Sequence, residues 1–301
     1  MAGVGAGMRV LVAGASGFIG TELCRQLESG GHTVLRLTRG APSGPNQFRW
    51  SPSAGSVDTE AIESADAVVN LAGAPTGRIP WTRRYKREIL YSRVNGTRTL
   101  AEAIGSAKSP PEVFLNGSAV GYFGDQPGVE LTETSAKGAG FLSDVVEAWE
   151  QAAQLAPSGT RVVTFRTGLV VGRGGAFTPL IPLTTLGLGA RMGSGRQHWP
   201  WVALHDEAAA IKHLLTSRLQ GVVNIAGPEA ATSARVTHAL AQALHRWDPW
   251  VVPTFALGLL GEAGHDLLLT SEHVVPARLL SDGFVFRYDS VEKAIGAMVA
   301  D

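Results

Sequence analysis

The sequence predicts an α/β protein in which a doubly wound parallel sheet is followed by a smaller C-terminal α/β lobe. Short apolar runs alternate with longer helical patterns through about residue 170, and this alternation is typical of a parallel sheet with helices on both faces. Beyond residue 170 the pattern loosens into a stretch rich in Gly, Pro and Leu, which favours loops and short helices. With 301 residues, 45% of them hydrophobic, the chain is long enough to bury a large core.

The individual elements follow from the local periodicity of the chain. Apolar runs predict strands over residues 9–13, 33–37, 67–71, 113–116 and 162–166. Helical patterns lie between them at 18–29, 86–104 and 141–155. They are followed by a helix at 206–217, a strand at 221–226, a helix at 231–247 and a terminal segment ending in 291–299. We expect a first domain over 8–170, rejoined by part of 200–230, and a smaller lobe over 171–301 whose final segment spans about 248–297, with a ligand in the crevice between them.

Charge and cysteine content narrow the class of protein. Lys plus Arg and Asp plus Glu number 26 each, so nothing electrostatic indicates nucleic acid or an anionic membrane as partner. The single cysteine, Cys24, cannot form an internal disulfide, which fits a reducing cytosol. We expect it to be buried as a small hydrophobic residue, with a redox or catalytic role as the alternative. No targeting or membrane-spanning pattern is visible, so a cytoplasmic protein is expected, as a monomer or a homodimer.

A glycine-rich turn joins the first predicted strand to the first predicted helix. Gly14 allows a tight turn, Gly17 lets backbone N–H groups approach a pyrophosphate, and Gly20 lets the helix pack closely on the strand. The N-terminus of the helix favours an anion at the same place. The strand before and the helix after favour a ligand site over a purely structural turn. The pattern therefore predicts a Rossmann-type dinucleotide site formed by Gly14, Ala15, Ser16, Gly17, Phe18, Ile19 and Gly20.

The end of the second predicted strand indicates which dinucleotide is bound. Units that bind NAD usually place an Asp or Glu here, where it accepts hydrogen bonds from the ribose hydroxyls. This chain has no acid at that place; Thr38 and Arg39 end the strand instead. Arg39 is suited to pair with a 2′-phosphate through its planar set of N–H donors, and Arg36 is a second candidate. The alternative is a solvated arginine, and NADP(H) is expected over NAD(H).

Several motifs resemble the extended short-chain dehydrogenase/reductase superfamily. They are the glycine turn and residues 70–73 (NLAG), 95–97 (NGT), 118–124 (SAVGYFG) and 166–172 (RTGLVVG). More narrowly, the chain is similar to the atypical branch of NAD-dependent epimerase family proteins, the YfcH- and SDR39U1-like proteins. The resemblance to that branch lies in residues 71–75 (LAGAP), 81–82 (WT), 92–94 (SRV), 193–199 (GSGRQHW), Trp201, 276–280 (PARLL) and 283–288 (GFVFRY).

The resemblance implies further site residues and a nucleotide-sugar epimerase or reductase ancestry. It adds Leu71, Ala72, Gly73 and Asn95 to the expected cofactor contacts. In the wider superfamily a Ser or Thr, a Tyr, and a Lys four residues after the Tyr carry the proton chemistry. Ser118 matches the serine position. The segment where Tyr-x-x-x-Lys should fall has Phe141 and Val145 instead, so the usual general acid/base is absent.

Tyr122 is the best available substitute for the missing tyrosine. It shares a loop with Ser118 at the carboxyl end of a predicted strand, where sites of this fold form. The alternative for Tyr122 is simple packing between loop and core, and for Ser118 a hydroxyl that caps the loop. Tyr91 and Lys86 share a helix but are offset on its surface.

Acidic residues near this loop have structural explanations. Asp125, Glu130 and Glu133 lie in an acidic loop, where ordinary solvated carboxylates are favoured over a carboxyl with a raised pKa acting as acid or base. Asp206 is expected to be the N-cap of a helix, with an acid in its first turn.

The segment over residues 196–201 combines hydrogen-bond donors with two indole rings. The family resemblance implies that this segment faces the substrate crevice. Arg196 and Gln197 are suited to hold a polar or anionic group of the substrate. Trp199 and Trp201 are suited to line the crevice with a flat apolar surface. Interdomain packing is an equally good explanation of these four residues. The histidines show no metal-ligand spacing, and no metal is expected.

These expectations combine into one functional hypothesis and a rival. The chain is expected to be an NADP(H)-binding oxidoreductase or nucleotide-sugar-epimerase-like protein that lacks the usual Tyr-x-x-x-Lys and acts on an unknown small polar substrate. Ser118 and Tyr122 are its candidate catalytic residues. The rival is a catalytically inactive NADPH-binding sensor or scaffold protein, which the absence of Tyr and Lys favours.

Overall fold

The computed structural model describes residues 7–300 and is built around one eight-stranded sheet. The strand order is β12-β8-β6-β5-β1-β2-β3-β4, and every pairing is parallel except that of β3 with the edge strand β4. The strands are β1 (Arg9–Ala13), β2 (Thr33–Thr38), β3 (Gln47–Ser51), β4 (Ser56–Val57), β5 (Ala67–Asn70), β6 (Val113–Ala119), β8 (Arg161–Thr167) and β12 (Gly221–Ile225).

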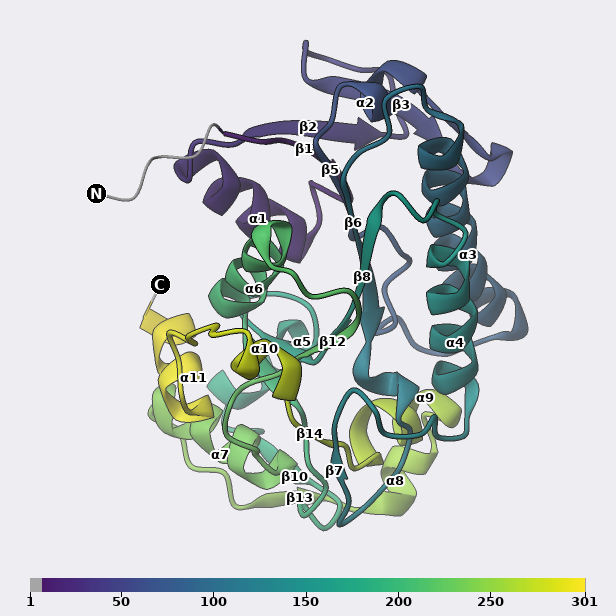
Figure 1. The fold of residues 1–301 in the computed structure, drawn as a ribbon. Helices are drawn as coiled ribbons and strands as arrows, with labels where there is room; N and C mark the ends of the chain where they lie inside the picture. Colours follow the sequence, from purple (N-terminus) through teal and green to yellow (C-terminus); the bar gives the residue numbers. More distant parts are fainter. Residues whose placement is uncertain (1–6, 301) are drawn as a thin grey trace.

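Helices cover both faces of this sheet. α1 (Phe18–Ser29) and α6 (Leu204–Thr216) pack together on one side, and α3 (Arg83–Ser106) and α4 (Phe141–Ala153) on the other (Figure 1). Successive residues of β1 point to opposite faces, so Val10 and Val12 join the core beneath α1 and α6, whereas Leu11 and Ala13 join the core beneath α3. The fold class expected from the sequence is confirmed.

A third core joins the later parts of the chain. It contains Phe177, Trp201 and Ile295, which come from different elements. The further helices are α2 (Thr59–Glu63), α5 (Phe177–Thr185), α7 (Ser233–Ala243), α8 (Thr254–Gly258), α9 (Glu262–Gly264), α10 (Ala277–Ser281) and α11 (Val291–Ala300), with 3₁₀ turns at Pro52–Ala54 and Val120–Tyr122 and a π-helical turn at His265–Leu269. Three two-stranded pairs complete the structure: β7 (Glu130–Leu131) with β14 (His273–Val274), β9 (Leu169–Val171) with β11 (Trp201–Ala203), and β10 (Ala190–Met192) with β13 (Trp250–Val252).

The predicted elements differ from the structure mainly at their ends and in the short segments. The helix expected over 231–247 ends at Ala243, because His245 adopts a left-handed conformation (φ 54°) that stops the helix. The chain between β2 and β5 contains β3, β4 and α2, which the sequence did not predict. The division into a first domain and a smaller lobe is retained as a proposal; β12, from the later part of the chain, pairs with β8 in the main sheet.

Two residues singled out in the sequence lie in the core. Cys24 is buried on α1, and burial raises the pKa of its thiol, which favours a packing role. Asp206 is not the N-cap expected for α6: Ala203 holds that position, and Asp206 lies in the first turn. Its carboxylate accepts hydrogen bonds from the backbone N–H groups of Arg287 and Tyr288, both at 3.0 Å. This buried side chain therefore anchors the segment before α11.

Candidate functional site

The glycine turn after β1 places α1 against the edge of the sheet. Gly14 has a φ of 84°, and a Cβ there would lie 2.9 Å from the carbonyl carbon of Leu71. A Cβ on Gly20 would lie 2.1 Å from the carbonyl oxygen of Gly14. Only glycine fits at either position, so the first turn of α1 lies directly against the loop that follows β1.

The N-terminus of α1 is free to receive an anion. Its N-cap is Gly17, no side chain caps the helix, and its first turn contains no acidic residue. The helix dipole and the free N–H groups therefore point at an open depression lined by Ser16, Gly17, Phe18, Thr21, Glu22 and Leu204. This geometry fits the pyrophosphate of a dinucleotide.

Arg39 lies at the same edge of the sheet as the glycine turn. Ala13, the last residue of β1, is paired in register with Leu37 of β2, so the ends of the two strands are adjacent. Thr38 fixes the following turn by accepting a hydrogen bond from the backbone of Gly40. The guanidinium of Arg36 is engaged by Glu28, whereas Arg39 is exposed and takes part in none of the ion pairs found within residues 7–300. Arg39 is therefore the better placed of the two for a 2′-phosphate.

A buried polar cluster fixes the loop after β5. Asn70 donates to Thr97 (2.9 Å) and Asn116 (2.8 Å), and the indole N–H of Trp149 donates to Thr97 (2.8 Å). The side-chain oxygen of Asn70 also accepts the backbone N–H of Ala72 at 3.2 Å. Leu71, Ala72 and Gly73 are thereby held beside the glycine turn, and Asn95 is half-buried on the neighbouring helix α3; that these residues contact the cofactor stays a prediction.

Ser118 and Tyr122 meet at an ion pair. The hydroxyl of Ser118 donates to Oε1 of Glu150 at 2.7 Å. Arg166 donates two hydrogen bonds to the same carboxylate, from Nε (2.8 Å) and from Nη2 (2.9 Å). The guanidinium carbon of Arg166 lies 3.4 Å from the centroid of the Tyr122 ring. The structure thus brings together the two candidate catalytic residues and adds Glu150 and Arg166, which the sequence analysis missed.

The orientation of Ser118 has a chemical consequence. Because the only hydroxyl proton of Ser118 is directed to Glu150, the oxygen of Ser118 is left as a hydrogen-bond acceptor. Arg166 is 2% exposed, and its Nη1 is buried without a partner among the described residues. Arg166 follows Phe165 among the buried residues of strand β8, and this was the one sequence signal of the pair, since a buried arginine needs a counter-charge.

Apolar contacts fill the positions where Tyr and Lys were expected. Val145 is 3% exposed and packs in a cluster with Tyr85 and Ile89 of α3. The ring of Phe141 contacts Trp81 edge-on, with a centroid separation of 5.5 Å. Lys86 lies 4.3 Å from the centroid of the Phe141 ring and forms an ion pair with Glu262. No proton-transferring group occupies these two positions.

The sequence comparisons identify the family. Residues 10–226 match the model of the NAD dependent epimerase/dehydratase family, and residues 252–298 match a domain of unknown function, DUF1731. The chain belongs to the NAD dependent epimerase/dehydratase family. This result confirms the resemblance found in the sequence motifs.

Named relatives of this epimerase-family protein cover nearly its whole length. It is 37% identical to Epimerase family protein ML0860 of Mycobacterium leprae over 290 residues, which is 95% of this chain and 94% of that one. It is 35% identical to human Epimerase family protein SDR39U1 over 301 residues, covering 97% of this chain and all of the human protein.

Two solved structures share its fold at appreciable identity. A crystal structure of human SDR39U1 (isoform 2) with NADPH matches with a TM-score of 0.90 and 33% identity, covering 98% of this chain and 100% of the other. A nucleoside-diphosphate sugar epimerase from Corynebacterium glutamicum matches with a TM-score of 0.80 and 28% identity, covering 98% of this chain and 59% of that protein.

The expected substrate-side residues of this epimerase-family protein are mostly buried. Gln197 donates to the backbone oxygens of Met192 (3.0 Å) and Leu268 (2.9 Å), which ties its loop to the C-terminal segment. Trp199 and Trp201 belong to the third core, whereas Arg196 is exposed. The burial of Gln197 and the two tryptophans agrees with the alternative explanation given from the sequence, that these residues serve packing. Arg196 is the one of the four with a freely exposed side chain.

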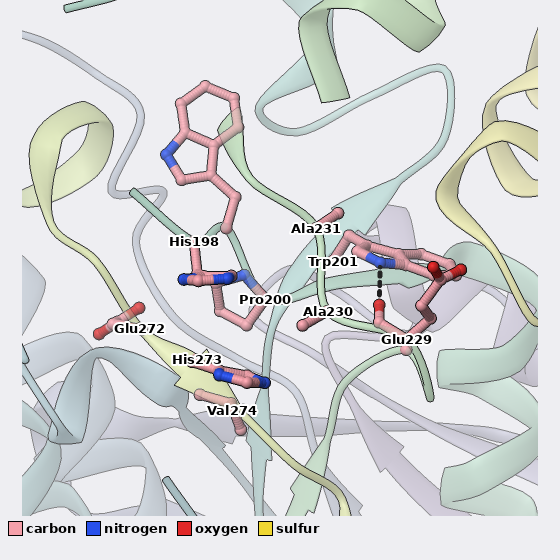
Figure 2. Close-up of a pocket in the computed structure, with 11 residues that line it drawn as sticks. His198, Pro200, Trp201, Glu229, Ala230, Ala231, Glu272, His273 and Val274 are labelled. Carbon is pink, nitrogen blue, oxygen red and sulfur yellow. Dashed lines mark hydrogen bonds between the residues drawn. The ribbon is translucent and has the colours of Figure 1, made fainter. Parts of the chain in front are cut away.

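Trp199 and Trp201 also line a small cavity. Figure 2 shows this cavity, where the ring of His198 lies over that of His273 with centroids 4.7 Å apart. The indole N–H of Trp201 donates to the backbone oxygen of Glu229 at 2.8 Å, as Figure 2 also shows. Burial and the neighbouring ring of His273 lower the pKa of His198, so the ring of His198 is suited to pack here in its neutral form.

The acidic loop is not uniformly solvated. Glu130 is exposed, but Glu133 is half-buried and accepts the backbone N–H groups of Asn224 and Arg278, both at 3.1 Å. The expectation of an ordinary surface carboxylate at Glu133 was therefore wrong, because this side chain joins its loop to β12 and to the start of α10. Asp125 is exposed and accepts the N–H of Ser271 at 2.8 Å.

Two carboxyl groups with a raised pKa were not anticipated from the sequence. Burial raises the pKa of Glu207 to about 8, against the opposing effect of a hydrogen bond from Thr167. Burial also raises the pKa of Glu272 to about 8, with further contributions from the charges of Asp266 and Asp125. Within residues 7–300, no three metal-ligating side chains come together, and no helix combines the length and apolar character needed to cross a membrane.

Proposed function

We propose that this epimerase-family protein binds NADPH along the carboxyl edge of its sheet. The observation that carries the proposal is the uncapped N-terminus of α1, formed around Gly14 and Gly20, with the free guanidinium of Arg39 one strand away. The presence of NADPH in the structure of human SDR39U1, at 33% identity, supports it. No acid stands at the end of β2 to favour NAD.

The proposed cofactor contacts come from the segments that follow β1, β2 and β5 and from α3. The glycine turn, with Ala15, Ser16, Phe18 and Ile19, would hold the pyrophosphate, and Thr38 and Arg39 the 2′-phosphate. Leu71, Ala72, Gly73 and Asn95 would flank the other half of the dinucleotide. When bound, the nicotinamide supplies hydride transfer, so the chain itself has to orient a substrate and handle one proton.

We further propose an oxidoreductase or epimerase-like reaction on a small polar substrate. Ser118 would accept a hydrogen bond from a substrate hydroxyl, because its own proton is held by Glu150. Tyr122, fixed face-on by Arg166, would present its phenol as the second polar contact. Glu150 and Arg166 position these two groups. Arg196 is the proposed substrate contact among residues 196–201, with Gln197, Trp199 and Trp201 supporting its loop.

An NADPH-binding sensor or scaffold without catalysis is the second candidate. The observation that favours it is the apolar packing of Phe141 and Val145 where the acid/base pair of the superfamily would stand. The two functions share the cofactor and differ only in turnover.

Turnover by two variants separates these candidates. With NADPH and a panel of carbonyl compounds, or NADP and a panel of sugar nucleotides, the enzyme is expected to show turnover that Ser118→Ala and Tyr122→Phe abolish. Both variants should bind NADPH within about threefold of the unaltered chain, since the two side chains contact Glu150 and Arg166 and are not among the proposed cofactor contacts. Unaltered turnover in both variants would remove the catalytic assignment, and NADPH binding without turnover on any panel would favour the sensor.

A further inference from the structure

Arg93 is an arginine of α3 that the proposed function does not use. Its Nη1 donates to the backbone oxygens of Ala74 (2.8 Å) and Ile89 (3.2 Å). Its guanidinium carbon lies 5.1 Å from the centroid of the Trp149 ring. The side chain is therefore fixed against the protein on one edge and on one face.

The charge of Arg93 has no counter-charge among the described residues. None of the ion pairs within residues 7–300 involves Arg93, whereas Arg166 faces Glu150 with two hydrogen bonds. Removal of water without a compensating carboxylate lowers the pKa of Arg93 to about 10. Burying a cation without a counter-charge destabilises the protein. A ligand with a negative charge or strong hydrogen-bond acceptors would offset this free energy.

The other edge of the guanidinium remains open. No hydrogen bond among the described residues uses Nε or Nη2 of Arg93, and neither atom is completely buried without a partner. These donors are available to oxygen atoms in the planar arrangement that suits phosphate or a pair of hydroxyls.

The loop after β5 places this open edge beside the proposed cofactor. A Cβ on Gly73 would lie 3.3 Å from Cγ and Cζ of Arg93, so glycine at this position leaves room for the arginine. The same loop contacts the glycine turn, since Leu71 donates its N–H to Ala13 at 2.9 Å. A dinucleotide whose pyrophosphate lies on the turn would extend its nicotinamide half across this loop.

The neighbouring helix α4 has Val145 at the position where the superfamily has a lysine. Val145 of α4 packs on Ile89 of α3, and Arg93 lies one helical turn after Ile89. A cation is thus present on α3 close to where the lysine of α4 is missing.

We propose that Arg93 binds oxygen atoms, of phosphate or ribose, in the nicotinamide half of the dinucleotide, replacing from α3 the positive charge that α4 lacks at Val145. This inference rests on the proposed binding of NADPH. An anionic group of the substrate offers the same oxygen chemistry, and the choice of ligands below separates the two sources.

The test compares two ligands on the full chain. NADPH contains both halves of the dinucleotide, whereas adenosine 2′,5′-bisphosphate contains only the half that faces Arg39. Arg93→Met should weaken NADPH binding by about tenfold or more, as expected for loss of charge-assisted hydrogen bonds, and leave the bisphosphate within about threefold. Arg93→Lys should recover part of the NADPH affinity. Arg98→Met, an exposed arginine on the same helix, is the matched control and should change neither ligand.

Each other outcome has a defined meaning. Equal NADPH affinity in the unaltered chain and Arg93→Met would overturn the assignment to the cofactor and leave a substrate anion as the partner of Arg93. Parallel loss of both ligands in Arg93→Met and Arg93→Lys would show a structural role and also overturn it. If the unaltered chain binds neither ligand, the proposed function itself fails.

Discussion

At the scale of single residues, buried charge is distributed in two different ways. Glu150 and Arg166 neutralise one another and fix Ser118 and Tyr122, so removing either partner would leave an isolated buried charge. Arg93 lacks such a partner within residues 7–300. The paired charges hold their neighbours in place, whereas the unpaired charge of Arg93 is the one that we propose to bind a ligand.

Glu207 gives the stability of the protein a specific pH dependence. Burial raises its pKa in the folded state from 4.5 to about 8. Between these values the folded state holds a proton that the unfolded state has released, so the contribution of Glu207 to stability is complete below pH 4.5 and is lost as the pH rises through 8. The slope is at most about 1.4 kcal/mol per pH unit for this one group.

The variant Glu207→Gln isolates this effect. A neutral amide keeps an acceptor for Thr167 and does not titrate. Urea unfolding from pH 5 to pH 8 should therefore show the unaltered protein losing free energy of unfolding relative to the variant as the pH rises. Parallel pH profiles for the two proteins would mean that Glu207 is already ionised in the fold.

Among the secondary structure elements, the sequence predicted most accurately those that form the proposed cofactor site. The residues of β1 and α1 match the predicted ranges, because a buried apolar run, spaced glycines and an amphipathic helix are local signals. β3 escaped prediction because it is short and alternates exposed and buried residues, with Phe48 and Trp50 as its only buried positions. α7 was predicted too long because the left-handed conformation of His245 is not evident from its residue type.

The packing of α1 on the glycine turn can be tested with one methyl group. Gly20→Ala should lower the free energy of unfolding by about 2 kcal/mol and weaken NADPH binding, because its Cβ would lie 2.1 Å from the Gly14 oxygen. Gly296→Ala is the control: this exposed glycine of α11 has no atom near its Cβ position, and alanine should stabilise that helix by about 0.5–1 kcal/mol. Equal small effects at both positions, measured by chemical denaturation, would argue against close packing of α1.

At the scale of the whole molecule, side chains distant in sequence are joined by the topology. Ser118 meets Glu150 and Arg166 because β6 and β8 are neighbours and α4 covers them. Glu133 reaches Arg278, and Gln197 reaches Leu268. Composition and spacing carry no information on such pairings. The glycine turn with β1 and α1, built on consecutive residues, was therefore predictable, whereas the Glu150–Arg166 pair and the acids with a raised pKa were not.

Cofactor preference is the measurement that tests the central claim most directly. Calorimetric titration of the full chain with NADPH, NADP, NADH and NAD should show tighter binding of the two phosphorylated forms. Arg39→Ala should reduce that preference by about tenfold or more, because the 2′-phosphate loses its guanidinium, whereas Arg36→Ala, whose side chain is engaged by Glu28, should retain it. Equal or tighter binding of NADH by the unaltered chain, or a preference that survives Arg39→Ala, would contradict the account.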